Sequence, residues 1–196
     1  STPTNAGGKF SSIAPSGLDC GLRSDTTPEN AVTETVPFAD KSITLTIPNK
    51  PRYYSQVQVR QKIMSAIDNI NKNTHKISPA DIKIVQNINH IVLSDMISRS
   101  GVEEKSGVFY LKIQEVMKQN VGYLSSNIAH DSFHIEQYKR GGYAASRSTQ
   151  AEVEAIDFQM RLMPALVIEE KSLKFLRKYQ SDPKAINTRR QPGLCD

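Results

Sequence analysis

His130-Asp131-Ser132-Phe133-His134 places two histidines four residues apart within a segment that has the pattern of a helix. Side chains at positions i and i+4 lie on one face of a helix, so both imidazoles can bind the same metal ion. The spacing is that of the H-E-x-x-H motif, in which the glutamate is the general base of a zinc hydrolase. Here the acid beside the first histidine is an aspartate, which is one methylene shorter. The motif therefore predicts a zinc site with an unusually short base.

The helix that carries the motif is predicted from about Leu124 to Lys139, and Gly141-Gly142 ends it, because glycine commonly follows a helix C-terminus. Three segments before it have the β-branched or alternating residues of strands. They are Ser42–Ile47, residues 88 to 94 and Val108–Ile113. We expect the second and third of these strands to pair with each other.

Apolar residues at helical spacing predict further helices at Ser55–Asn71, from Thr149 to Met163-Pro164, and at about Ile168–Gln180, with a short helical turn after Ser78. The order of strand, helix, strand, strand and three helices predicts an α+β fold. Its small mixed or antiparallel sheet would pack on the metal-binding helix, and further helices would follow.

Three regions differ in composition. Residues 1–38 are rich in Ser, Thr, Pro and Gly without a sustained period, which predicts an irregular N-terminal arm. Residues 39–181 hold the predicted elements, and residues 182–196 form a tail. Cys20 and Cys195 lie in the arm and the tail, where they could pair or remain free thiols.

The overall composition favours a globular protein. Of the 196 residues, 38% are hydrophobic and 23% charged, and no apolar run approaches the roughly 20 residues that span a bilayer, so no membrane span is expected. The net charge of +5 would suit acidic partners, but the basic residues are scattered. Nucleic-acid binding is therefore not favoured. The first residues lack the pattern of a signal peptide, and the start at Ser1 suggests a processed chain.

A third metal ligand is expected on the helix after the glycine pair. Glu152-Val153-Glu154-Ala155 supplies two carboxylates, of which Glu152 is the preferred ligand and Glu154 the reserve. Glu152 could instead cap its own helix by bonding to the backbone of Thr149.

With these residues the chain resembles the zincin metallopeptidases, specifically the gluzincins. In that family the H-E-x-x-H helix is followed by a helix with a glutamate ligand, often in the pattern E-x-x-A, which residues 152–155 match. The resemblance covers about residues 42–164. It implies a zincin-like domain that binds Zn²⁺ through His130, His134 and Glu152 and hydrolyses peptides with Asp131 as general base. It also implies that Val108–Ile113 is an edge strand that pairs with a peptide or protein substrate.

Four further residues are candidates for supporting roles. Asp157 could orient a ligand histidine, and Asn127, one turn before Asp131, could support that carboxylate. Tyr143 and Arg147 lie in the predicted connection between the helices, where an oxyanion or substrate contact could sit, although structural roles suit both.

Two alternatives remain open. The doublet His130-Asp131 also resembles the HD phosphohydrolases, with His90 and Asp157 as further ligands, but that family is essentially all helical. A non-catalytic zincin-like binding module is the other alternative, and the aspartate is its main support. The basic composition and the processed-looking start would suit a secreted or delivered effector, such as a toxin domain.

Overall fold

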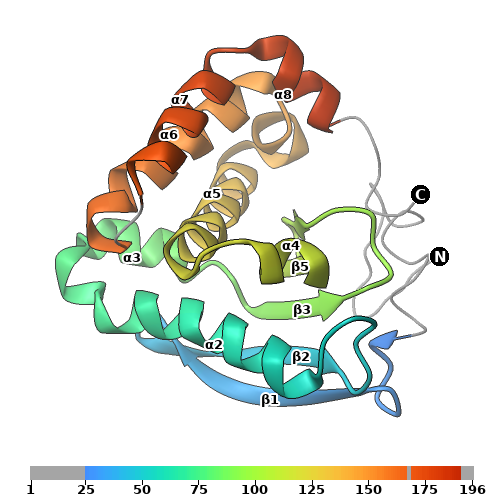
Figure 1. Cartoon of the computed structure of the whole chain (residues 1–196). Coiled ribbons are helices and arrows are strands. Elements are labelled where there is room, and N and C mark those ends of the chain that lie inside the picture. The colour runs from blue at the N-terminus through green and yellow to red at the C-terminus, as the bar shows by residue number, and fades with distance from the viewer. Residues whose placement is uncertain (1–24, 167–168, 191–196) are drawn as a thin grey trace.

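The computed structural model describes residues 25–166 and 169–190, so Cys20 and Cys195 lie outside the described part of the chain. A mixed sheet and a set of helices make up the fold, which confirms the α+β class (Figure 1). In chain order the elements are β1 (Ala31–Phe38), β2 (Lys41–Pro48), α2 (Gln56–Lys72), η2 (Thr74–Lys76), α3 (Pro79–Val85), β3 (His90–Ser94), β4 (Gly101–Glu103), β5 (Val108–Lys112), α4 (Ile113–Lys118), α5 (Val121–Ser146), α6 (Thr149–Leu166), α7 (Glu170–Gln180) and α8 (Pro183–Arg190).

The sheet has five strands in the order β1-β2-β3-β5-β4. The outer pairs β1–β2 and β4–β5 are antiparallel, whereas β2–β3 and β3–β5 are parallel. All three predicted strands are present, and the predicted pairing of the second with the third is confirmed by β3 and β5, where Ile91 lies opposite Phe109. The sheet is therefore mixed.

The prediction that Val108–Ile113 is an edge strand is wrong. On the side of β5 away from β3, Gly101–Glu103 pairs with Tyr110, Phe109 and Val108. Further along, the Lys112 N–H donates to Ser100 Oγ at 2.9 Å. The polar segment before β5 folds back on it as a hairpin, because Gly107 adopts the left-handed backbone conformation (φ 75°) that a tight turn requires. The last predicted residue, Ile113, begins α4.

Part of the predicted irregular arm is also a strand. Residues 31–38 pair with β2 along their whole length, from Ala31 opposite Pro48 to Phe38 opposite Lys41. The sequence of β1, AVTETVPF, is rich in β-branched residues, and the hairpin buries Val36 and Phe38 in the core. At the other end of the chain, the predicted tail contains α8, which buries Ile186.

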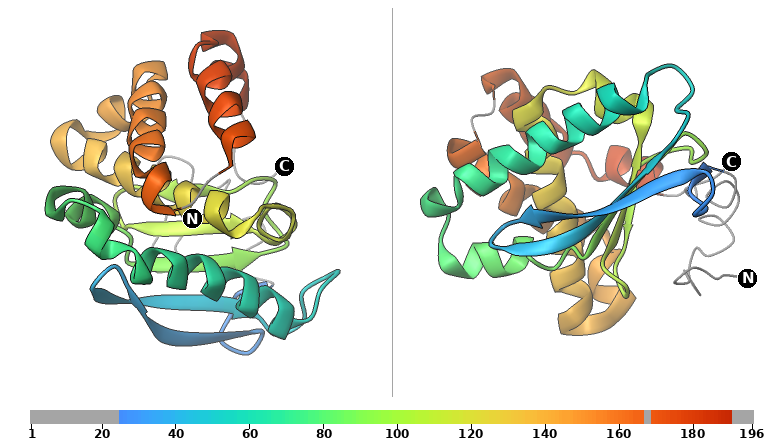
Figure 2. Two further views of the ribbon diagram at one scale, coloured as in Figure 1. Left: turned by 60° about the vertical axis from the view of Figure 1, so that its left-hand side comes forward. Right: turned by 90° about the horizontal axis from the view of Figure 1, so that it is seen from below.

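The core lies between the sheet and the helices. In the right-hand view of Figure 2, the helices lie on one side of β3 and β5. Helix α2 begins with a capping box formed by Ser55 and Gln58, and its apolar face packs against the strands and against α5. The buried residues of this face are Val59, Ile63, Ala66, Ile67 and Ile70. This packing fixes α5, the helix that carries the histidine pair.

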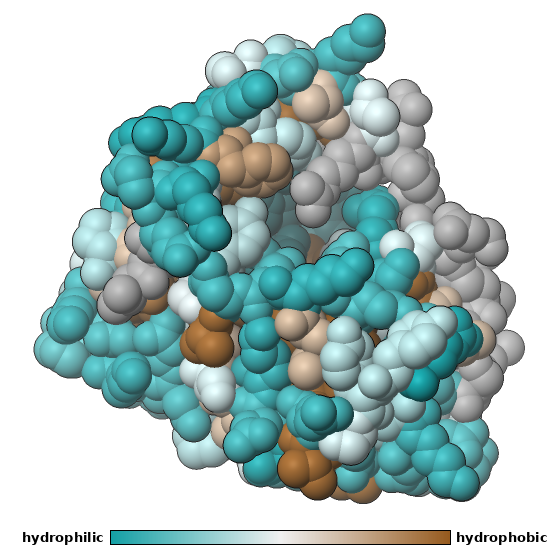
Figure 3. All heavy atoms as spheres, viewed as in Figure 1, coloured by the Kyte–Doolittle hydropathy of each residue, from teal (hydrophilic) through white to brown (hydrophobic). Residues whose placement is uncertain are grey.

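The surface facing the viewer in Figure 3 is mostly hydrophilic and is hollowed near its centre. Within residues 25–166 and 169–190, no helix has both the length and the apolar character that crossing a membrane requires.

Candidate metal centre

Helices α5 and α6 bring the three predicted ligands together. Asn120 caps α5 by accepting a hydrogen bond from the Tyr123 N–H, so the helix is established well before His130. It is interrupted at the predicted glycine pair, where Gly142 has a left-handed φ of 71°. After this kink the helix continues to Ser146, and α6 then packs along α5. Glu152, in the first turn of α6, therefore faces the histidines.

The three ligand atoms form a small triangle. His130 Nε2 lies 3.2 Å from His134 Nε2, and Glu152 Oε1 lies 3.3 Å and 3.0 Å from these two nitrogens. Zinc binds imidazole nitrogen at about 2.0–2.1 Å in tetrahedral geometry, which separates two ligand atoms by about 3.3 Å. The sides of this triangle thus match the separations within one face of a zinc coordination tetrahedron, so the three residues could hold a zinc ion.

The centre is shielded from solvent without being sealed. Side-chain exposure is 13% for His130, 7% for His134 and 11% for Glu152. Low exposure strengthens the electrostatic attraction between these groups and a bound cation.

A buried glutamine fixes the orientation of His134. Gln137 Nε2 donates to the carbonyl of Ala151 at 2.9 Å and to Glu154 Oε1 at 3.2 Å, and both of these groups only accept. The amide oxygen of Gln137 therefore faces His134 Nδ1, 2.8 Å away, and that nitrogen carries the hydrogen. As a result, His134 Nε2 presents a lone pair to the centre.

A second buried glutamine does the same for His130. Gln159 Oε1 lies 2.9 Å from His130 Nδ1, while its Nε2 donates to Ser126 Oγ and to Asn127 Oδ1. Asn127 in turn donates to Gln119. Asn127 thus supports His130 through Gln159, whereas the sequence prediction linked it to Asp131.

Two imidazole nitrogens and a carboxylate oxygen converge within 3.3 Å of one another, an arrangement that a bound cation would stabilise. Without a metal ion, a proton takes this role. Burial opposes the charged form of His130, but the carboxylate of Glu152 outweighs it and raises the pKa of His130 to about 9. Burial also opposes the charged form of Glu152, yet the two histidines hold its pKa well below the usual range. The centre is therefore built to hold positive charge.

Asp131 lies beside this triangle, and its carboxylate has no hydrogen-bond donor among the described residues. The side chain is only partly exposed. Burial raises the pKa of Asp131, although the neighbouring histidines oppose this effect. A carboxylate with a raised pKa and no fixed partner is free to accept a proton.

The choice between the two glutamates is clear in the structure. Ser148, not Glu152, caps α6, since its hydroxyl accepts from the Ala151 N–H. The Glu152 carboxylate faces the two histidines, and the Thr149 hydroxyl donates to Asn187. The reserve ligand Glu154 is exposed. It accepts a hydrogen bond from Gln137, which itself contacts His134, so Glu154 is connected to the triangle only through that glutamine.

Three of the other candidates lie away from the ligand triangle. Asp157 is exposed and accepts a hydrogen bond from Gln180 of α7 at 2.6 Å, so it does not orient a histidine. The Tyr143 hydroxyl donates to Glu103, and Arg147 forms a bidentate pair with Glu104. Tyr143 lies within the last turn of α5 and Arg147 at its C-cap, not in a longer connection as predicted, and these contacts hold the end of α5 against the end of β4.

The metal arrangement of the HD phosphohydrolases is not formed. His90 Nε2 bonds to Thr46 Oγ1 at 2.8 Å across neighbouring strands, and Asp157 faces α7. Within residues 25–166 and 169–190, the one group of His, Cys, Asp and Glu side chains close enough to hold a metal ion is that of His130, His134 and Glu152.

Comparisons with protein-family models, with curated proteins and with solved structures give no match to this chain. The zincin resemblance therefore remains a prediction from the motif.

Gln159 provides a test of the metal centre. We expect Gln159→Leu to weaken zinc binding about 10- to 100-fold, because His130 loses the acceptor that fixes its tautomer. Competition with a chromophoric zinc chelator measures this change. Gln180→Leu is the matched control, since that glutamine bonds to Val153 and Asp157 on the outer side of α6. Equal zinc affinity in the two variants would refute a role for Gln159.

Proposed function

We propose that this protein is a zinc-dependent hydrolase that cleaves peptide bonds. The observation that carries the proposal is the triangle of His130 Nε2, His134 Nε2 and Glu152 Oε1, with sides of 3.0–3.3 Å. Two histidines and one carboxylate with an open fourth position make up a ligand set of catalytic zinc sites, whereas structural zinc sites use four protein ligands.

The chemistry requires a base next to the ion, and Asp131 is the proposed base. Bound zinc would supply a Lewis acid that lowers the pKa of a water molecule and polarises a carbonyl oxygen. The Asp131 carboxylate then accepts the proton of the attacking water and passes it to the leaving amine. Within the part of the chain that the structure describes, no other group bonds to this carboxylate, and its pKa is raised by burial; both features support the role.

The peptide substrate follows from the zincin resemblance. Because β5 is covered by β4, the edge of the sheet at this end is β4. Glu103 and Glu104 join the end of β4 to Tyr143 and Arg147 at the end of α5. We therefore assign the extended substrate to the outer edge of β4.

The proposal is tested by metal removal. The zinc-loaded protein should cleave members of a random peptide mixture, which mass spectrometry detects. Chelation should abolish cleavage, and one equivalent of zinc should restore it. Cobalt, which accepts the same geometry, should also restore activity.

A second candidate is a non-catalytic metal-binding module. The specific observation in its favour is the aspartate, which reaches about one C–C bond less far than the glutamate of the H-E-x-x-H motif. Stoichiometric zinc without cleavage of any peptide would support this candidate and overturn the hydrolase.

A further inference from the structure

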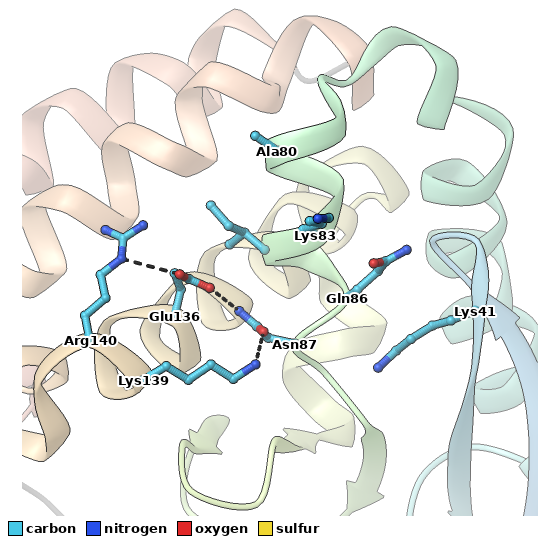
Figure 4. A pocket seen from close by; sticks show the side chains of 9 residues that line it. Lys41, Ala80, Lys83, Gln86, Asn87, Glu136, Lys139 and Arg140 are labelled. Atoms are coloured by element: carbon cyan, nitrogen blue, oxygen red, sulfur yellow. Dashed lines mark hydrogen bonds and ion pairs between the residues drawn. The ribbon is translucent and has the colours of Figure 1, made fainter.

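A surface pocket lies on the opposite side of α5 from the candidate metal centre. Glu136 follows His134 by two positions, which is about 200° around the helix. The pocket has a volume of about 670 Å³ and is formed by α3, α5 and the start of β2 (Figure 4). Volumes in this range are typical of sites for small molecules.

The side chains around this pocket are mainly cationic. Lys41 from β2, Lys83 from α3, and Lys139 and Arg140 from α5 contribute four positive charges, against one carboxylate from Glu136. Arg140 is paired with that carboxylate at 3.4 Å. The three lysine charges remain.

Two of the three lysines donate to neutral amide oxygens instead of carboxylates. Lys139 Nζ donates to Asn87 Oδ1 at 2.6 Å, and Lys41 Nζ donates to Asn89 Oδ1 at 3.1 Å. The exposed Lys83 has no hydrogen bond or ion pair with any described residue. Amide acceptors orient an ammonium group without neutralising it, so the positive charge is kept available.

Two of the ammonium groups are close enough to repel each other. In Figure 4, Lys41 and Lys139 extend toward Asn87 from opposite sides of the pocket. Burial and the charge of Lys139 lower the pKa of Lys41. An anion between these side chains would relieve the repulsion and gain charge-assisted hydrogen bonds.

We propose that this pocket binds a small ligand that carries two or more phosphate groups. Three unneutralised lysines and a neighbouring arginine exceed what a single carboxylate requires, and they suit a multiply charged anion with several acceptor oxygens. Ala80 and Ile84 add an apolar part to the lining, against which the organic part of such a ligand can pack. The site is independent of the proposed hydrolase, because it uses another face of α5.

Tripolyphosphate is the probe, and the metal-free protein is used because polyphosphates chelate zinc. Isothermal titration calorimetry should show one site, weakened by added NaCl. The triple variant Lys41→Gln, Lys83→Gln, Lys139→Gln should bind on the order of 10- to 100-fold more weakly. The matched control removes three charges elsewhere, at Lys171, Lys174 and Lys178 of the basic helix α7, and should bind like the unmodified protein.

A single substitution tests the same site even if the triple variant fails to fold. Lys83 is exposed and has no partner among residues 25–166 and 169–190, so Lys83→Gln should weaken binding several-fold and leave the melting temperature unchanged. Equal losses in the two triple variants would show attraction by net charge alone and overturn the site. Loss of tripolyphosphate binding in His134→Ala with no loss in Lys83→Gln would move the anion to the metal centre, which also overturns it. Binding of single-stranded DNA through the same lysines, without tripolyphosphate binding, would do so as well.

Discussion

We expect His134→Ala to abolish stoichiometric zinc binding. The substitution removes one corner of the ligand triangle and leaves His130 Nε2 and Glu152 Oε1, which lie 3.3 Å apart, as the remaining protein ligands. Two ligands hold zinc far more weakly than three, because each imidazole supplies both a bond and part of the preformed geometry. Elemental analysis after dialysis should give about one zinc per chain for the unmodified protein and almost none for the variant.

The matched control for this variant is His75→Ala. His75 is exposed in the short helix η2, far along the chain from α5, so it should leave the zinc content unchanged. Circular dichroism of the metal-free proteins would verify that both variants fold. Full zinc content in a folded His134→Ala protein would rule out the proposed ligand set.

Local patterns were sufficient to predict which three side chains come together at the candidate centre. The spacing of His130 and His134 fixes their common face on a helix, and Gly141-Gly142 marks where the chain can turn toward Glu152. These features lie within about two dozen consecutive residues. They depend on helix geometry, which short sequences specify well.

The partners of the histidines could not be predicted in the same way. Gln137 and Gln159 bond to His134 and His130, yet neither residue belongs to a recognised motif. A signal was present in their spacing, because Gln159 follows Glu152 by seven positions and so shares its face of α6. Which of several polar residues on that face meets His130 depends on the rotation of α6 against α5, which the stacking of Phe133 on Phe158 helps to set.

The errors in the sheet have a different origin. A strand pattern shows which residues favour extended backbone, but it does not show which neighbour covers each edge. The segment Gly101–Glu103 is too short to give a pattern of its own, and it nevertheless covers β5. Similarly, β1 is strand because it pairs with β2, and the Ser, Thr and Pro content of residues 1–38 concealed it.

The second large effect is expected at Asp131, where Asp131→Asn should retain zinc and lose hydrolysis. The amide is nearly the same size as the carboxylate, so the ligand triangle should persist, but an amide cannot accept the proton of the attacking water. Loss of a general base commonly reduces the rate about 10²- to 10⁴-fold. The measurement is the rate of peptide cleavage at equal zinc content. Asp157→Asn is the control, because that acid is exposed on the outer side of α6 and bonds to Gln180.

The variant Asp131→Glu distinguishes an aspartate that acts as the general base from one that has made the zinc centre inactive. The longer side chain restores the acid of the H-E-x-x-H motif and moves the carboxylate about one C–C bond outward from the helix. If Asp131 acts as a base at a distance that limits catalysis, the glutamate variant should cleave peptides at least as fast as the unmodified protein, while the asparagine variant is inactive. A glutamate variant that cleaves while the unmodified protein does not would mean that the aspartate has switched off an intact zinc centre. Cleavage by Asp131→Asn at the unmodified rate would exclude this residue as the base, because no other change in the variant could supply a proton acceptor.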